Sequence, residues 1–199
     1  MHRPALLGIL LLLEALSGSA RAAAAGPETM LDAGDDAPLA EVLAYREIDA
    51  GLSTAGQITA AQIPLLRDAG FGLVINLAVA DEARNGEEGF LVSREGLAYA
   101  QIPVLWASPT LADLDLFFAV MDARAGRRTL VHCFANFRAS AFTYLYRTLR
   151  LGVPEPEARA DLEAIWTDEA FAEYPQWAAF IEQARAHYGE GDSAGDAEP

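Results

Sequence analysis

Cys133 and Arg138 are the residues of this sequence best suited to chemistry, and they stand five positions apart. The apolar run Thr129-Leu130-Val131 leads into His132 and Cys133, and an amphipathic stretch follows Arg138. Loop amides, the unpaired amides of a helix start and a guanidinium fork can converge on one oxyanion. Such surroundings favour a nucleophilic thiolate over a thiol. The pattern therefore predicts a reactive Cys133 in an anion-binding site that Arg138 closes.

A plainer interpretation of Cys133 is a buried thiol at the end of a strand, with Arg138 on the surface by coincidence. Cys133 is the single cysteine of the chain, so it cannot form an internal disulfide. It is either buried as a small apolar residue or retained for its chemistry. His132 also has two interpretations, a structural partner at the cysteine backbone or a proton-transfer base.

The pattern His132-Cys133-x4-Arg138 between a strand and a helix resembles the cysteine-dependent protein tyrosine and dual-specificity phosphatases. The core is most similar to the bacterial beta-lactamase-hydrolase-like phosphatase family, over roughly residues 45–150. This resemblance implies two-step hydrolysis, in which Cys133 attacks phosphorus and water then cleaves the phosphocysteine. It also places Tyr45, Arg46 and Gln57 near the site. The matching segments are Ser53–Gln57, Val74–Leu77, Tyr99–Val104 and Leu130–Cys133.

The loop between cysteine and arginine departs from the usual phosphatase form. It has four residues where most phosphatases have five, and rhodanese sulfurtransferases also have a shorter loop. It lacks the central glycine of such loops, and Asn136 is the next best residue for a left-handed position. Either one phenylalanine stacks on substrate at the mouth, or both pack into the core. The four loop residues, which are the candidate substrate-binding residues, are Phe134, Ala135, Asn136 and Phe137.

The residues that would assist proton transfer and thiolate departure are less clearly marked. Ala139 replaces the hydroxyl expected directly after the arginine, but Ser140 could support the departing thiolate or cap the helix. Residues 105–110, where a general acid is expected, contain no carboxylate. Asp113 is the candidate acid just beyond them, although its place three residues after Thr110 also suits a helix cap. The alternatives are Asp81, Glu82, Glu87 and Glu88, which also suit a solvated acidic loop.

Alternating apolar runs and amphipathic stretches predict the elements that position these residues. We expect an α/β single domain with a central four- or five-strand, mostly parallel sheet flanked by helices, and extra helices at the C-terminal end. The expected strands are one or two within 45–52, then 72–77, 98–104 and 129–131, with a turn at 53–57. The expected helices begin at a Thr59–Gln62 capping box, before Glu95, at Thr110, near Ala139, at Pro154 and at Pro175.

Composition excludes several classes of function. The formal net charge is −15, which disfavours nucleic acid and anionic lipid as partners. Three histidines and one cysteine form no cluster with metal-ligand spacing, and no Gly-rich nucleotide loop is present. We therefore expect no metal, no cofactor and no membrane partner after signal removal.

The ends of the chain predict export. Residues 1–22 have the basic start, apolar run and Ala20-Arg21-Ala22 motif of a secretory signal peptide, so we expect a periplasmic or secreted protein. We expect a flexible lead-in over 23–40, the phosphatase-like domain over 41–188 and a disordered acidic tail over 189–199.

Three functions are consistent with these residues. The first is an exported phosphatase that acts on a phosphorylated small molecule or a phosphoprotein, with Cys133 as nucleophile and Arg138 as oxyanion clamp. The second is a rhodanese-like sulfurtransferase that carries a persulfide on Cys133. The third is a phosphate- or phosphoprotein-binding module with weak or no catalysis, suggested by the missing acid.

Overall fold

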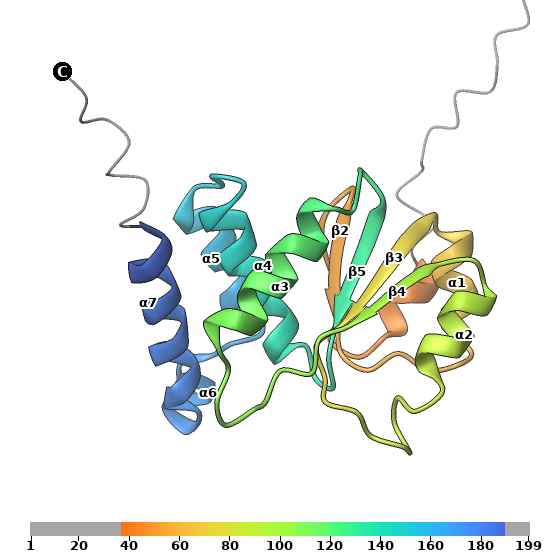
Figure 1. Cartoon of the computed structure of the whole chain (residues 1–199), viewed down its shortest axis with the longest axis horizontal. Coiled ribbons are helices and arrows are strands. Elements are labelled where there is room, and N and C mark those ends of the chain that lie inside the picture. Colours follow the sequence, from red (N-terminus) through yellow and green to blue (C-terminus); the bar gives the residue numbers. More distant parts are fainter. Residues whose placement is uncertain (1–36, 190–199) are drawn as a thin grey trace, which may run out of the picture. The chain divides into compact units, whose positions relative to one another are not determined.

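The computed structural model describes residues 37–189, whose helices and strands are drawn in colour in Figure 1. A five-stranded sheet has β5 (Arg128–His132) at its centre, between β2 (Leu52–Ala55) and β3 (Phe71–Asn76). The edge strands are β1 (Arg46–Asp49), beside β2, and β4 (Ala98–Gln101), beside β3. The pairs β2–β5, β5–β3 and β3–β4 are parallel, and only β1–β2 is antiparallel. The expected mostly parallel sheet is confirmed.

Helices cover both faces of the sheet, which explains the continuous apolar runs of β3 and β5. Figure 1 shows α3, α4, α5 and α7 on one side and α1 and α2 on the other. The helices are α1 (Ile63–Asp68), α2 (Glu88–Arg94), α3 (Leu111–Asp122), α4 (Phe137–Leu149), α5 (Glu155–Glu163), α6 (Asp168–Glu173) and α7 (Pro175–Gly189), preceded by a 3-10 helix, η1 (Ala37–Glu41).

Two apolar clusters, one against each face, form the core. The larger contains Phe117 of α3, Phe142 of α4 and Trp177 of α7, all fully buried. The smaller contains Leu39 and Leu66. The helical faces expected from α3 and α7 are confirmed, since their apolar positions are buried. Among the described residues, no helix is both long and apolar enough to span a bilayer.

Several expected boundaries are wrong. The expected turn at 53–57 is instead largely strand, because Ser53, Thr54 and Ala55 are buried within β2, where small side chains suit the packing of α4. The expected lead-in over 23–40 overlaps η1, whose Leu39 is buried beneath the sheet. The expected tail begins one residue too early, since α7 includes Gly189. The predicted signal peptide lies outside the described residues.

The helix start expected at Thr59 lies further along the chain. Gln62 Oε1 does accept a hydrogen bond from Thr59 N at 2.9 Å, which is half of a capping box. The helix nevertheless begins at Ile63, where Pro64 occupies the first turn. Proline suits that turn because the first amides of a helix have no intrahelical partner. The short helix α6 was not expected from the sequence.

Candidate active site

A pocket of about 310 Å³ lies over the carboxyl end of β5, with Cys133 in its lining. Cys133 directly follows β5, and its amide donates to Ala55 O of the neighbouring strand at 3.3 Å. The residue is only 1% exposed, so the thiol can be reached only through this pocket. The pocket is lined by Trp106, Cys133, Phe134, Ala135, Phe137, Arg138 and Tyr174.

The loop after Cys133 turns through Asn136, which has the left-handed φ of 67° expected for it. Asn136 Nδ2 donates to Ala44 O at 2.8 Å and to Thr54 Oγ1 at 3.0 Å, and the residue is fully buried. The side chain therefore fixes the loop to the sheet and does not line the pocket. Its expected role in substrate binding is replaced by a role in shaping the loop.

Replacing Asn136 with alanine is expected to lower the free energy of unfolding by about 2 kcal/mol, from left-handed strain and two lost hydrogen bonds. Glycine at the same position loses the hydrogen bonds but tolerates the φ of 67°. Chemical denaturation of both variants checks this. A glycine variant as unstable as the alanine variant would show that the backbone conformation contributes nothing.

Arg138 lies in the first turn of α4 and reaches over the pocket. Its Nε donates to Val104 O at 2.9 Å, and the side chain is held at 5.2 Å from the ring centre of Trp106. Among the described residues, Nη1 and Nη2 of Arg138 have no hydrogen-bond partner. The guanidinium is thus oriented by one nitrogen while two remain for an oxyanion.

The start of α4 adds backbone donors beside the arginine. The first backbone hydrogen bond of the helix runs from Ser140 N to Asn136 O at 2.8 Å. The amides of Phe137, Arg138 and Ala139 precede that bond, so they are the unpaired donors of a 13-residue helix. These amides point out of the N-terminal end of α4, where the Cys133 loop joins the helix. Unpaired amides at a helix start bind anions.

The C-terminal helices hold the far wall of the pocket. Phe137 packs edge-on against Trp166, with ring centres 4.8 Å apart, and Trp166 Nε1 donates to Phe137 O at 2.9 Å. Trp177 Nε1 donates to Trp106 O at 3.1 Å, and Tyr174 packs edge-on against Trp106. Phe137 therefore belongs to an aromatic cluster and only borders the pocket. The helices after Pro154, expected to be a packing layer, also position active-site residues.

A buried polar network lies behind Cys133. His132 Nε2 is 2.9 Å from Glu88 Oε1, and both residues are at least 96% buried. Asn76 Nδ2 donates to the same oxygen at 3.0 Å, and Gln57 Nε2 donates to the other carboxylate oxygen. Burial raises the pKa of Glu88, but the hydrogen bonds and charge of His132 outweigh it and hold the pKa below its usual value. His132 is therefore a structural partner, and Glu88, one of the alternative candidate acids, is unsuited to that role.

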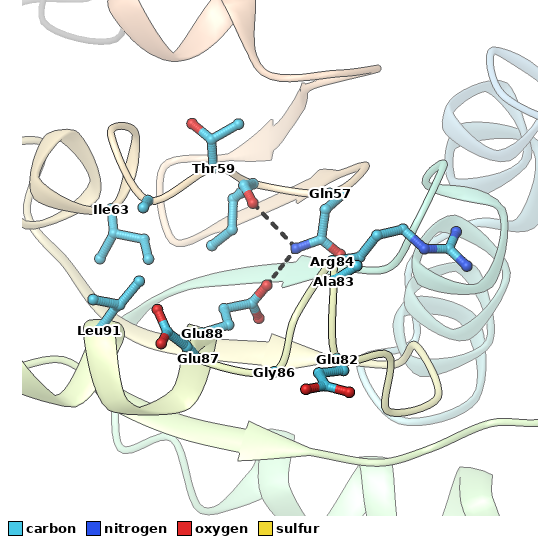
Figure 2. Close-up of a pocket in the computed structure, with 12 residues that line it drawn as sticks. Gln57, Thr59, Ile63, Glu82, Ala83, Arg84, Gly86, Glu87, Glu88 and Leu91 are labelled. Carbon is cyan, nitrogen blue, oxygen red and sulfur yellow. Dashed lines mark hydrogen bonds between the residues drawn. The ribbon is translucent and has the colours of Figure 1, made fainter.

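A second pocket, of about 370 Å³, lies beside this network (Figure 2). Figure 2 shows the Gln57 side-chain amide directed at Glu88. Gln57 Nε2 also donates to Ile58 O, at 3.1 Å. Glu82 and Glu87, two further candidate acids, line this pocket and not the one over Cys133. The Gln57 amide donates to Phe134 O at 3.2 Å, so the two pockets share one wall.

The other candidate residues are not among the described residues that line the Cys133 pocket. Asp113 closes a capping box with Thr110, whose amide donates to Asp113 Oδ2 at 3.1 Å. Ser140 Oγ donates to Asn136 O at 2.9 Å, within its own helix. Tyr45 bonds Ser53, and Arg46 bonds Asp161, away from the pocket lining. Of the described residues that line the pocket, none carries a carboxylate.

No described residues form a group of three or more side chains that could hold a metal ion. The reactive groups of the pocket are Cys133, Arg138 and the backbone of their loop. These three features suit an oxyanion that is attacked by sulfur.

Solved structures share this fold. A protein from Shewanella putrefaciens CN-32 described as a "Putative phosphatase (DUF442)" is 36% identical, with a TM-score of 0.67, over 77% of this chain and 96% of that chain. Tk-PTP in its active form is 14% identical, with a TM-score of 0.58, over 71% and 96% of the two chains. TpbA from P. aeruginosa, in complex with pTyr, is 14% identical, with a TM-score of 0.55, over 73% and 90%. Comparisons with family models and with curated proteins find no match.

The sheet and the Cys133–Arg138 loop define a cysteine-dependent phosphatase, as the resemblance implied. The likeness to Tk-PTP and TpbA concerns the fold alone. The 36% identity extends over nearly all of the S. putrefaciens protein, so this chain belongs to the DUF442 family.

Proposed function

We propose that this protein hydrolyses phosphotyrosine or small phosphomonoesters through a phosphocysteine on Cys133. The observation that carries the proposal is the pocket that holds both Cys133 and a preoriented Arg138, two of whose nitrogens have no partner among the described residues. Arg138 is the one charged side chain among the described residues of the lining, so its fork is the recognition element for the phosphate.

The chemistry proceeds in two displacements. The Cys133 thiolate attacks phosphorus, a sulfur–phosphorus bond forms, and the ester oxygen leaves with a proton taken up from solvent. Water then attacks the phosphocysteine, the sulfur–phosphorus bond breaks, and inorganic phosphate leaves while the thiolate is restored. Arg138 and the first amides of α4 stabilise the equatorial oxygens in both steps.

The missing carboxylate sets the preferred leaving group. A positioned general acid contributes about 10²–10⁴-fold to such reactions, chiefly when the leaving oxygen is basic. Phenolic oxygens leave more readily than alkyl oxygens, so aryl phosphates depend less on an acid. This favours phosphotyrosine over phosphoserine, and the structural neighbour TpbA was captured with phosphotyrosine.

The leaving-group dependence is a testable prediction. We expect kcat/KM for 4-nitrophenyl phosphate to exceed that for an alkyl phosphate by at least about 10²-fold, the range a missing acid implies. Steady-state phosphate release from both substrates checks this. Equal rates would indicate a proton donor that the pocket lining does not reveal.

Two assays decide between phosphoryl and sulfur transfer. The purified protein is offered 4-nitrophenyl phosphate in one and thiosulfate with cyanide in the other, each beside Cys133→Ser. We expect phosphate release by the native protein and none by the variant. Thiocyanate formation would instead support a persulfide on Cys133. Activity in neither assay would support a phosphate-binding module without catalysis.

Export to the periplasm is a further part of this proposal, supported by the signal-like residues 1–22. We expect the protein in the periplasmic fraction with Ala23 as its first residue, as N-terminal sequencing would show. An intact N-terminus on a cytoplasmic pool would contradict export and leave the phosphatase chemistry unaffected.

A further inference from the structure

Arg84 lies against the active-site loop, although nothing in the sequence pattern singles it out. Its guanidinium carbon is 3.7 Å from the ring centre of Phe134, which lines the Cys133 pocket. Figure 2 shows the side chain leaving the second pocket and extending away from Gln57 and Glu88. Arg84 therefore brings a cation from the segment between β3 and α2 to the rim of the active site.

The catalytic arginine stands over the same ring. The guanidinium carbon of Arg138 is 5.9 Å from the centre of the Phe134 ring, so the two guanidinium carbons are at most 9.6 Å apart. Two cations this close repel each other, and an anion near both relieves that repulsion. The chain has a net charge of −15, so two guanidinium groups over one ring are a local exception, although Asp81 pairs with one of them.

The position of Arg84 is fixed by its own segment. Asp81 Oδ2 accepts from Arg84 Nε at 3.0 Å and from Nη2 at 2.8 Å, while Asp81 Oδ1 accepts from the amide of Ala83 at 3.1 Å. The buried Asn85 accepts from the Asp81 amide at 2.8 Å and donates to Val79 O at 3.0 Å. The arginine is thus oriented before any ligand arrives.

The ion pair with Asp81 leaves Arg84 able to bind a second anion. Its side chain is 55% exposed, and Nη1 has no hydrogen-bond partner among the described residues. Exposed ion pairs are weak because water and salt screen them, so a ligand anion can share the guanidinium. Phe134 is covered by Arg84 on one face, which restricts substrate stacking, one of the two roles considered for the loop phenylalanines.

We propose that Arg84 forms a second anion subsite at the rim of the Cys133 pocket. The preferred substrates are then phosphomonoesters that carry a second anionic group, a carboxylate or another phosphate, held over Phe134 while Arg138 holds the reacting phosphate. This inference rests on the proposed phosphatase function, whose site it extends. A purely structural Arg84, which only shields Phe134, would confer no preference for such substrates.

Matched substrate pairs test the subsite. The probes are phenyl phosphates with a para-linked acetate, propionate or butyrate, each beside its uncharged carboxamide. We expect at least one carboxylate to exceed its amide in kcat/KM by about tenfold, the effect of one charge-assisted hydrogen bond. The ratio should fall to about one in Arg84→Gln, and added salt should reduce it in the native protein.

Arg94→Gln is the matched control. Arg94 is also an exposed arginine over a phenylalanine, 6.0 Å from the ring centre of Phe90, but neither residue lines the Cys133 pocket. This variant should keep the native carboxylate preference. Thermal unfolding of both variants should match the native protein, since both side chains are exposed.

A carboxylate preference that survives in Arg84→Gln, or that never appears with any linker, would overturn the subsite. If the native protein hydrolyses none of the probes, the proposed function is wrong. Calorimetric binding of the same probe pairs then tests separately whether Arg84 forms an anion subsite. Tighter binding of a carboxylate that is lost in Arg84→Gln supports it, and equal binding of carboxylate and amide overturns it.

Discussion

Replacing Arg138 with lysine is expected to lower kcat/KM for 4-nitrophenyl phosphate by about 10²–10³-fold, the usual effect of removing one oxyanion donor. Arg138 uses Nε to bond Val104 O at 2.9 Å, which aims its other two nitrogens at the pocket. A lysine ammonium is a single point charge on a flexible stem, so it cannot make both sets of contacts. The loss should fall mainly on kcat, because the fork that holds the equatorial oxygens in line with the attacking sulfur is lost.

Arg147→Lys provides a control on the same helix. Arg147 is also buried in α4, but it bonds Asp161 and Glu157 and not the pocket lining. Its replacement should cost stability because it disrupts a partly buried ion pair, while kcat/KM stays near the native value. Steady-state kinetics and thermal unfolding of both variants check this. Equal catalytic losses would show that Arg138 acts only through the fold.

The reactive loop could be predicted from sequence because its determinants are local. A strand, a cysteine, four residues and an arginine at a helix start fix the loop within a few peptide units. The left-handed conformation of Asn136 was also predictable, since few residue types other than glycine tolerate a φ of 67° and asparagine is one of them. The apolar runs of β3 and β5 predicted a buried parallel sheet for the same local reason.

The parts that escaped prediction depend on contacts between distant segments. Glu88 was indistinguishable from its solvated acidic neighbours until the fold placed it against His132, 44 positions along the chain. Arg84 meets Phe134 only because the segment after β3 folds over the loop after β5. Charge and periodicity describe one segment at a time, so they could not identify either pair.

The prediction of a turn at 53–57 was wrong for a different reason, since residues Ser53–Ala55 form part of a buried strand. Its small polar side chains are typical of turns, and only the packing of α4 against β2 makes small residues necessary there. For Asp113 the local signal was the correct one, since its position suited a helix cap as well as a catalytic acid. The capping box with Thr110 is present, and no carboxylate lies among the described residues that line the pocket.

Replacing Glu88 with alanine is expected to lower the free energy of unfolding by about 3–5 kcal/mol, the usual cost of removing one partner of a buried pair. His132, Asn76 and Gln57 would each lose a hydrogen-bond acceptor where water has little access. Domains of this size are stable by about 5–15 kcal/mol, so this loss is a large share of the total. Denaturant unfolding with a fluorescence readout checks it.

Glu87→Ala is the matched control, because Glu87 is exposed and directly precedes Glu88. It removes the same charge from the same end of α2 without touching the buried network. We expect a change within about 0.5 kcal/mol, as for other surface substitutions. A loss in Glu87→Ala equal to that in Glu88→Ala would assign the effect to charge at the helix start and not to the network behind Cys133.

The Glu88 network also predicts how the stability of the fold changes with pH. Burial opposes ionisation of Glu88, but His132 holds its folded pKa below the ordinary value of 4.5. Stability from a lowered carboxyl pKa is fully present above the unfolded value and is lost as pH falls through the folded one. The stability difference between the native protein and Glu88→Gln should therefore shrink as pH falls below the ordinary pKa.

Unfolding of both proteins from about pH 7 to about pH 3 tests this sign, since linkage acts only where the proton uptake of the two states differs. Other carboxyls with lowered pKa values, such as Asp81 and Glu155, are present in both proteins, so their contributions cancel. A stability difference that grows on acidification would mean that the folded pKa of Glu88 is raised. The burial of its carboxylate would then outweigh the partnership with His132, and the network would hold a neutral acid behind the reactive cysteine.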